Sequence, residues 1–328
     1  MMQAIINHEY GPPEDLKLQE LEKPTIGEDS VLVRVRAASV NPYDWHVLRG
    51  VPYFVRLSEG LRRPKHPIPG VDVAGQVEAV GANVTRFQPG DEVFCGRSGA
   101  FAEYLCVVER NFTPKPPALS FEQAAAIPMA GCTALQALRD AGRLQPGQRV
   151  LINGAAGGIG TFAVQIARAM GAEVTGVCST PNVELVNSIG ADEVIDYTVD
   201  DFAKGKRQYD LIIDLVGNRS LSDLRRALTR EGTVVLVGGG GGNWLGPLAD
   251  PARAFVVSRF VSQRLLPFLA KLRTKDMVFL TELIEDGKLT PVIGRTYSLS
   301  ETPDAIRHVE TGHARGKTLI TVGSPAPA

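Results

Sequence analysis

The order of hydrophobic and polar positions changes character twice along the chain. Up to about residue 120, short apolar runs alternate with polar residues and are interrupted by Gly and Pro. Alternation with a period of two is typical of half-buried strands. We expect such strands at Val31–Arg36, Val71–Val80, Glu92–Phe94 and Ala100–Val108. Short strands separated by Gly and Pro turns favour a partly closed antiparallel barrel over a series of β-α-β units.

From Leu119 to about Gly287, helical patterns alternate with short apolar runs, and Ser120 is placed to cap the first helix. We expect helices near residues 159–170, 182–189 and 219–229. The expected strands are Arg149–Asn153, Glu173–Cys178, Glu193–Asp196, Tyr209–Asp214 and Thr233–Val237. Strands and helices in alternation predict a parallel sheet covered by helices, which is an α/β fold.

Strand signals return at the end of the chain, in Ile293–Tyr297 and Lys317–Val322, with a short helix expected over Glu301–Glu310. We expect this tail to rejoin the β-rich first part. The predicted organisation is therefore one domain from residues 1–120 and 288–328 and a second domain from residues 121–287, with residues 324–328 frayed.

Composition narrows the possible partners. The 328 residues carry a formal net charge of -1, so no overall positive field favours nucleic acid or an anionic membrane. No apolar run reaches membrane-spanning length, and the N-terminus lacks the pattern of a secretory signal. The four cysteines form no C-x-x-C pair, which argues against a zinc knuckle and suits reduced thiols. We expect a cytoplasmic protein.

A glycine-rich turn is the strongest chemical signal. The apolar run Val150–Asn153 ends in Gly154–Gly160, which opens into a helical pattern and then into a second strand. This order presents backbone N–H groups to a pyrophosphate. In the pattern G-x-G-x-x-G, Ala155 takes the first position, Gly157 allows close approach of the pyrophosphate, and Gly160 allows helix–strand packing. We predict cofactor contacts from Ala156, Gly157, Gly158 and Ile159; the alternative is a turn that serves packing alone.

The end of the second strand bears on which nicotinamide cofactor binds. In NAD sites an acidic residue about twenty positions past the glycines binds the ribose 2′-hydroxyl. Here that place falls at Cys178, with no acid beside it in the sequence, and Ser179 and Thr180 follow with hydroxyl donors. The pattern favours NADPH. NADH stays open, because no Lys or Arg lies in this loop.

At this point the chain resembles the medium-chain dehydrogenase/reductase superfamily, most closely its zinc-independent quinone oxidoreductase branch. The segments that carry the resemblance are Ser39–Asp44, Pro67–Gly75, Phe87–Val93 and Ala155–Gln165. The resemblance implies a GroES-like β-barrel catalytic domain, a Rossmann domain with a doubly wound parallel sheet, and an active site in the cleft between them. It also suggests a homodimer.

The zinc positions of this superfamily are altered. By the resemblance, Asn41 replaces a cysteine ligand, Val71 replaces the histidine, and Met129 lies near the third position. Valine cannot ligate zinc, and neutral Asn or Met is a poor substitute for a thiolate. Only Phe94–Phe101 separates the strands where a four-Cys zinc lobe would be. We therefore expect no metal.

Without a metal to stabilise an alkoxide, alcohol oxidation is disfavoured, whereas a quinone or an enone already delocalises the charge that arrives with hydride. The sequence thus predicts an NADPH-dependent oxidoreductase that reduces a small-molecule quinone or enone. The alternatives are a zinc-type alcohol dehydrogenase and a low-turnover NADPH-binding regulatory protein.

Three side chains near the start of the resemblance are candidates for catalysis. Asn41 could hydrogen-bond the nicotinamide ribose or the acceptor carbonyl, or could simply form the turn before Pro42. Tyr43 and His46 are the candidate proton donors. Asp44 is expected to anchor its loop. The further predicted cofactor contacts are Thr133, Tyr197, Val216, Gly238, Gly239 and Lys317.

Overall fold

The computed structural model describes residues 1–238 and 261–323, and the chain divides into two compact units. The first unit contains Met1–Ala130, Leu272–Glu285 and Pro291–Ala328, and the second contains Gly131–Lys271 and Asp286–Thr290. This division differs from the boundaries expected from the sequence, because residues 121–130 and 272–285 belong to the first unit and residues 288–290 to the second.

The first unit is built around a seven-stranded sheet in which β3 is central. The order is β14-β15-β3-β4-β5-β7, and β6 also pairs with β3. The strands are β3 (Ser30–Val40), β4 (Asp72–Val80), β5 (Glu92–Gly96), β6 (Tyr104–Val108), β7 (Thr113–Pro114), β14 (Ile293–Ser298) and β15 (Lys317–Thr321). A separate antiparallel pair joins β1 (Met2–Ile6) and β2 (Lys17–Leu21). Because β15 pairs antiparallel with β3, the tail rejoins the first part of the chain, as predicted.

Strand β3 follows the sequence pattern from which it was predicted. Val31, Val33 and Val35 are fully buried, whereas Arg34 on the opposite face is exposed. The buried valines belong to a core cluster that includes Phe101 and Phe112. The return strand starts at Tyr104, later than expected, because residues 99–101 instead bond to the backbone of the 69–70 turn.

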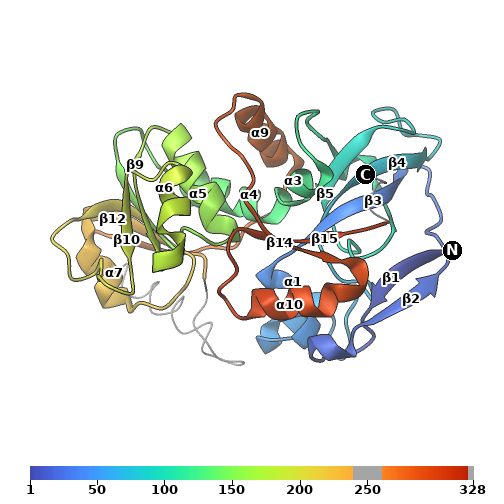
Figure 1. The fold of residues 1–328 in the computed structure, drawn as a ribbon, viewed down its shortest axis with the longest axis horizontal. Coiled ribbons are helices and arrows are strands. Elements are labelled where there is room, and N and C mark those ends of the chain that lie inside the picture. Colours follow the sequence, from blue (N-terminus) through green and yellow to red (C-terminus); the bar gives the residue numbers. More distant parts are fainter. Residues whose placement is uncertain (239–260, 324–328) are drawn as a thin grey trace. The chain divides into compact units, whose positions relative to one another are not determined.

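Two helices of the first unit begin where the polar side chains of Asn41 and Ser120 cap their first turns. The helices in which it takes part are α1 (Pro42–Arg49), α2 (Arg56–Glu59), α3 (Phe121–Ala125), α4 (Pro128–Gln136, which continues into the second unit), α9 (Thr274–Glu285) and α10 (Thr302–Glu310). Helix α1 is capped by Asn41, whose backbone N–H donates to Asp44 Oδ2 at 2.7 Å. In Figure 1, α10 lies beside β14 and β15.

The second unit holds a six-stranded parallel sheet in the order β10-β9-β8-β11-β12-β13, flanked by helices (Figure 1). The strands are β8 (Arg149–Asn153), β9 (Glu173–Cys178), β10 (Glu193–Asp196), β11 (Tyr209–Asp214), β12 (Leu228–Leu236) and β13 (Arg264–Pro267). The helices include α5 (Gly158–Ala169), α6 (Val183–Ser188) and α7 (Leu221–Ala227). The predicted parallel sheet is confirmed, and β12 begins before the expected residue 233. Among the described helices, none combines the length and apolarity required to cross a bilayer.

Candidate functional site

The first unit encloses a buried polar cluster formed by Ser39, Asn41, Asp44, Asp72 and Lys317. Asn41 Nδ2 donates to Asp72 Oδ2 at 3.0 Å, and Lys317 Nζ donates to Asn41 Oδ1 at 2.6 Å. The Lys317 ammonium also lies 3.5 Å from Asp72 Oδ2. Both sides of the Asn41 amide are therefore engaged, which fixes its orientation.

Asp72 is the centre of this cluster, and it is fully buried at the start of β4. Besides Asn41 and Lys317, it accepts hydrogen bonds from Ser39 Oγ at 3.1 Å and from the Met129 backbone N–H at 3.0 Å. A buried carboxylate requires such partners to offset its lost hydration. These four partners indicate that Asp72 has a structural role in the cluster.

Burial governs the protonation of the cluster. Desolvation lowers the pKa of Lys317, and the carboxylates of Asp72 and Asp44 raise it only in part. Desolvation likewise raises the pKa of Asp72, while Lys317 opposes that change. The pKa of Asp44 rises to about 7, first because of burial and then because the Asp72 charge lies nearby. The cluster therefore holds one cation against two carboxyl groups whose charged forms are both disfavoured by burial.

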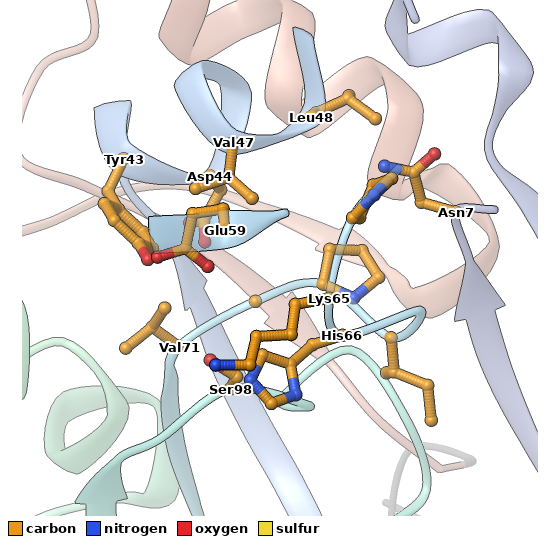
Figure 2. A pocket seen from close by; sticks show the side chains of 14 residues that line it. Asn7, Tyr43, Asp44, Val47, Leu48, Glu59, Lys65, His66, Val71 and Ser98 are labelled. Carbon is orange, nitrogen blue, oxygen red and sulfur yellow. The ribbon is translucent and has the colours of Figure 1, made fainter. Parts of the chain in front are cut away.

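A pocket lies next to the cluster in the first unit (Figure 2). Residues that line it include Tyr43, Asp44, Glu59, Lys65, His66 and Val71. The Tyr43 hydroxyl faces the Glu59 carboxylate. Burial and this carboxylate raise the pKa of Tyr43, so its hydroxyl stays protonated at neutral pH.

His46 is placed differently from Tyr43. Its Nδ1 lies 2.8 Å from the Val51 carbonyl oxygen, and its ring stacks on Trp45. Burial lowers its pKa, so the ring is neutral at pH 7 and carries a single N–H. Since the carbonyl can only accept, that proton is on Nδ1 and is already donated. His46 is not among the residues that line the pocket.

The glycine turn of the second unit has the geometry that a pyrophosphate site requires. Gly154 has a φ of 91°, and Gly157 precedes the first residue of α5. A Cβ added at Gly157 would meet only the Gly154 carbonyl oxygen at 3.5 Å, whereas one at Gly160 would clash with that oxygen and lie 2.7 Å from the Ala155 carbonyl carbon. Gly160 therefore permits close packing, and Gly157 leaves open space before the helix N-terminus, where an anion is favoured.

Strand pairing places an acid beside the predicted cofactor residue Cys178. In the register of β10 with β9, Asp196 lies opposite Cys178. Its carboxylate accepts from the Thr198 hydroxyl at 2.7 Å and from the Thr180 side chain, and these hydrogen bonds lower its pKa. The acid is ionised at neutral pH. Sequence reasoning missed it because it considered only chain neighbours.

A second missed residue is Asp214, buried at the end of β11. Its Oδ1 accepts from Asn153 Nδ2 at 2.8 Å and from the backbone N–H of Gly217 at 3.1 Å. These bonds shape the loop that carries the predicted contact Val216, which is 46% exposed. The sequence did contain a signal for Asp214, because it is a polar residue at the end of an apolar strand, and ligands approach the carboxyl ends of the strands in such sheets.

The other predicted contacts are distributed over both units. Lys317 lies in the buried polar cluster, Thr133 is buried on α4, and Tyr197 is 46% exposed after β10. Gly238 follows β12, and Gly239 lies outside the described residues. Ala156, Gly158 and Ile159 lie on the turn and first positions of α5, and Ser179 and Thr180 follow β9. Over residues 1–238 and 261–323, no group of three His, Cys, Asp or Glu side chains is placed to hold a metal ion.

Comparisons with known proteins agree with both units. The family model described as "Alcohol dehydrogenase GroES-like domain" matches residues 27–117, and that described as "Zinc-binding dehydrogenase" matches residues 189–320. The chain is 33% identical to the Spinacia oleracea protein "Quinone-oxidoreductase homolog, chloroplastic", over 98% of each chain. It is 35% identical to the Mus musculus "NAD(P)H oxidoreductase RTN4IP1, mitochondrial", over 98% of this chain and 89% of that protein.

The fold comparison gives the same result. The solved quinone oxidoreductase of Coxiella burnetii superposes with a TM-score of 0.84 at 31% identity, covering 98% of this chain and 99% of that one. These matches confirm the GroES-like domain and the Rossmann-like parallel sheet that the resemblance implied. With relatives above 30% identity along almost its whole length, the chain belongs to the medium-chain dehydrogenase/reductase superfamily.

Proposed function

We propose that this chain transfers hydride from a nicotinamide cofactor to a quinone or an enone, without a metal. The observation that carries the proposal is the ammonium of Lys317, buried 2.6 Å from Asn41 Oδ1 and 3.5 Å from Asp72. A fixed cation beside Asn41 opposes a second cation there, and the neighbouring Val71 offers no ligand atom. The relatives that are named quinone oxidoreductases support the acceptor class.

The residues of the second unit fit a dinucleotide. The open space at Gly157 and the first N–H groups of α5 would hold the pyrophosphate. When bound, the cofactor supplies hydride. A quinone that accepts hydride and one proton leaves as hydroquinone, and an enone takes hydride at its β-carbon and a proton at its α-carbon. The protein then has to orient the acceptor and deliver a proton.

The test is an acceptor screen on purified protein. We expect oxidation of NADPH or NADH in the presence of short-chain quinones or enones, with the rate unchanged after treatment with a chelator. Metal analysis of protein purified without chelator is expected to give much less than one zinc per chain. Stoichiometric zinc, or no cofactor oxidation across a broad panel of quinones and enones, would overturn the proposal.

Tyr43 is the proton donor that the pocket favours. We expect Tyr43→Phe to lower kcat for enone reduction about 100-fold, the scale of general acid catalysis, because the hydroxyl that lines the pocket is lost. His46→Gln is the matched control, since the single imidazole proton is already donated to the Val51 carbonyl. Stopped-flow and steady-state rates measure both. A large loss in His46→Gln with little in Tyr43→Phe would reverse the assignment.

Cofactor preference depends on two opposing features. The hydroxyls of Ser179 and Thr180 favour a 2′-phosphate, and the ionised Asp196 repels it. We therefore propose that both NADPH and NADH bind. We expect Asp196→Asn to raise the affinity for NADPH about 10-fold relative to NADH, since the repulsion between the Asp196 carboxylate and the 2′-phosphate is removed. Fluorescence titration with each cofactor measures this ratio; an unchanged ratio would show that Asp196 does not face the ribose.

A further inference from the structure

The segment from Tyr53 to His66, here called the basic-apolar segment, contains three large apolar side chains that are exposed to solvent. Phe54 is 43% exposed, Leu57 is 77% exposed and Leu61 is 69% exposed. They lie within eight residues of one another, around the short helix α2. Single exposed leucines are normal on protein surfaces, but a group of this kind marks an interaction surface.

The same segment is strongly basic, although the whole chain has a net charge of -1. It carries Arg56, Arg62, Arg63 and Lys65 against the single acid Glu59. All but Arg56 of these bases are exposed. The expectation that this protein has no membrane partner came from the summed charge, and a sum conceals a local positive patch of this size.

The exposed side chains are held outward by an ordered backbone. The Tyr10 hydroxyl donates to the Gly60 carbonyl oxygen, and the Lys65 N–H donates to the Glu59 carbonyl oxygen at 2.6 Å. Arg56 Nε donates to the Gly50 carbonyl oxygen at 2.9 Å, with its guanidinium over the Tyr10 ring. These contacts fix the backbone on either side of Leu57 and Leu61.

The basic-apolar segment also forms one wall of the pocket. Glu59, Lys65 and His66 line the pocket and face Tyr43 and Asp44 across it (Figure 2). The free volume of about 20 Å³ is room for about one water molecule. A quinone ring can reach Tyr43 through this pocket only if the wall moves, and the outer part of the same segment carries the exposed leucines.

We propose that the basic-apolar segment docks on an anionic phospholipid bilayer and opens the pocket toward a lipophilic quinone dissolved in that bilayer. That the acceptor is a quinone rests on the proposed function. That the segment binds a bilayer does not. Binding at a membrane surface has two contributions, and this segment can supply both. Its basic side chains attract anionic lipid headgroups, and its exposed leucines and Phe54 can be buried among the acyl chains. A second copy of this chain is a poorer occupant, because a symmetric contact at this patch would oppose two basic segments.

The test is co-sedimentation of the full chain with two kinds of vesicle, one of equal parts phosphatidylcholine and phosphatidylglycerol and one of phosphatidylcholine alone. We expect binding to the anionic vesicles that weakens as salt is added. Leu57→Glu with Leu61→Glu is expected to weaken this binding at least about 100-fold, by loss of apolar burial and gain of repulsion. Arg62→Gln with Arg63→Gln is expected to weaken it about 20-fold.

The matched control is Val199→Glu with Leu269→Glu, which adds the same charges at side chains 84% and 90% exposed in the second unit. This variant should bind vesicles as the wild type does, apart from a small change in the salt dependence. None of the substituted residues lines the pocket, so all variants should reduce a water-soluble quinone at the wild-type rate when the cofactor is saturating. With a long-chain quinone held in anionic vesicles, the Leu57→Glu, Leu61→Glu variant should lose most of its rate and the Arg62→Gln, Arg63→Gln variant a smaller part of it. The control variant should keep the wild-type rate.

Three results would overturn the docking proposal. They are the absence of wild-type binding to anionic vesicles, equal loss of binding in the control variant, and conversion of an oligomer to a monomer by Leu57→Glu with Leu61→Glu in light scattering. The last would assign the segment to an interface between copies or to another protein. Because vesicle binding is measured without turnover, its failure is distinct from a failure to reduce any quinone.

Discussion

Replacing Lys317 with Met is expected to lower the free energy of unfolding of the first unit by about 3–5 kcal/mol, the cost of leaving a buried charge without its partner. The Lys317 side chain is 3% exposed and Asp72 is fully buried, so water cannot replace the lost ammonium. The measurement is urea unfolding followed by tryptophan fluorescence in a Trp244→Phe background. Trp45, next to the cluster in the sequence, is then the one remaining tryptophan.

Two further variants make this result specific to the buried pair. Adding Asp72→Asn to Lys317→Met is expected to restore more than half of the lost stability, because neither charge then remains buried alone. Lys23→Met breaks the exposed pair with Glu78, which is 2.8 Å long, and is expected to leave the urea midpoint nearly unchanged. Equal losses for Lys23→Met and Lys317→Met would show that the cluster does not hold a buried ion pair.

The cluster supports the proposal that this unit works without a metal. Asn41 and Val71 stand at positions where the superfamily uses ligands, and Lys317 brings a positive charge to Asn41 from the far end of the chain. Lysine and zinc both offer positive charge to an oxygen, but only lysine does so with directed N–H donors. The tail that rejoins β3 thus supplies a residue of the proposed site as well as a strand of the sheet.

The fold could be predicted from periodicity because each unit has a simple pattern. Strands β8, β9, β10 and β11 have the bounds that their apolar runs predicted, since a parallel sheet is buried on both faces. The boundaries between the two units were harder to predict from the sequence. Residues 274–285 form helix α9 whichever unit contains them, and only their long-range packing places this helix in the first unit.

The residues of the candidate site could be predicted where they stand in a short sequence motif. They could not be predicted where they meet through the pairing of strands or through distant hydrogen bonds. The glycine turn and Asn41 stand in recognisable motifs, whereas Asp196 reaches Cys178 across a strand pair and Asp214 acts through backbone N–H groups three residues on. Lys317 was taken from the resemblance, but its partners 245 and 276 positions away could not be read from any local pattern. Hydrogen-bond partners, more than residue types, were the missing information.

A methyl group at Gly157 is expected to separate cofactor binding from folding. Gly157→Ala should lower the affinity for NADPH and NADH about 100-fold, because the added carbon occupies the space through which a pyrophosphate reaches the N–H groups of α5 and removes charge-assisted hydrogen bonds. The same carbon meets no protein atom closer than 3.5 Å, so the free energy of unfolding should change by less than about 1 kcal/mol. Cofactor fluorescence titration and urea unfolding measure the two effects.

Gly160→Ala is the matched variant, three residues further along the same turn. Its methyl group would clash with the Gly154 carbonyl oxygen, so α5 must shift from β8, at a cost of about 1–3 kcal/mol of stability together with loss of cofactor binding. The contrast identifies the role of each glycine, since one faces the ligand space and the other the protein. Wild-type affinity in Gly157→Ala, with destabilisation confined to Gly160→Ala, would mean that the turn serves packing alone and that the pyrophosphate binds elsewhere.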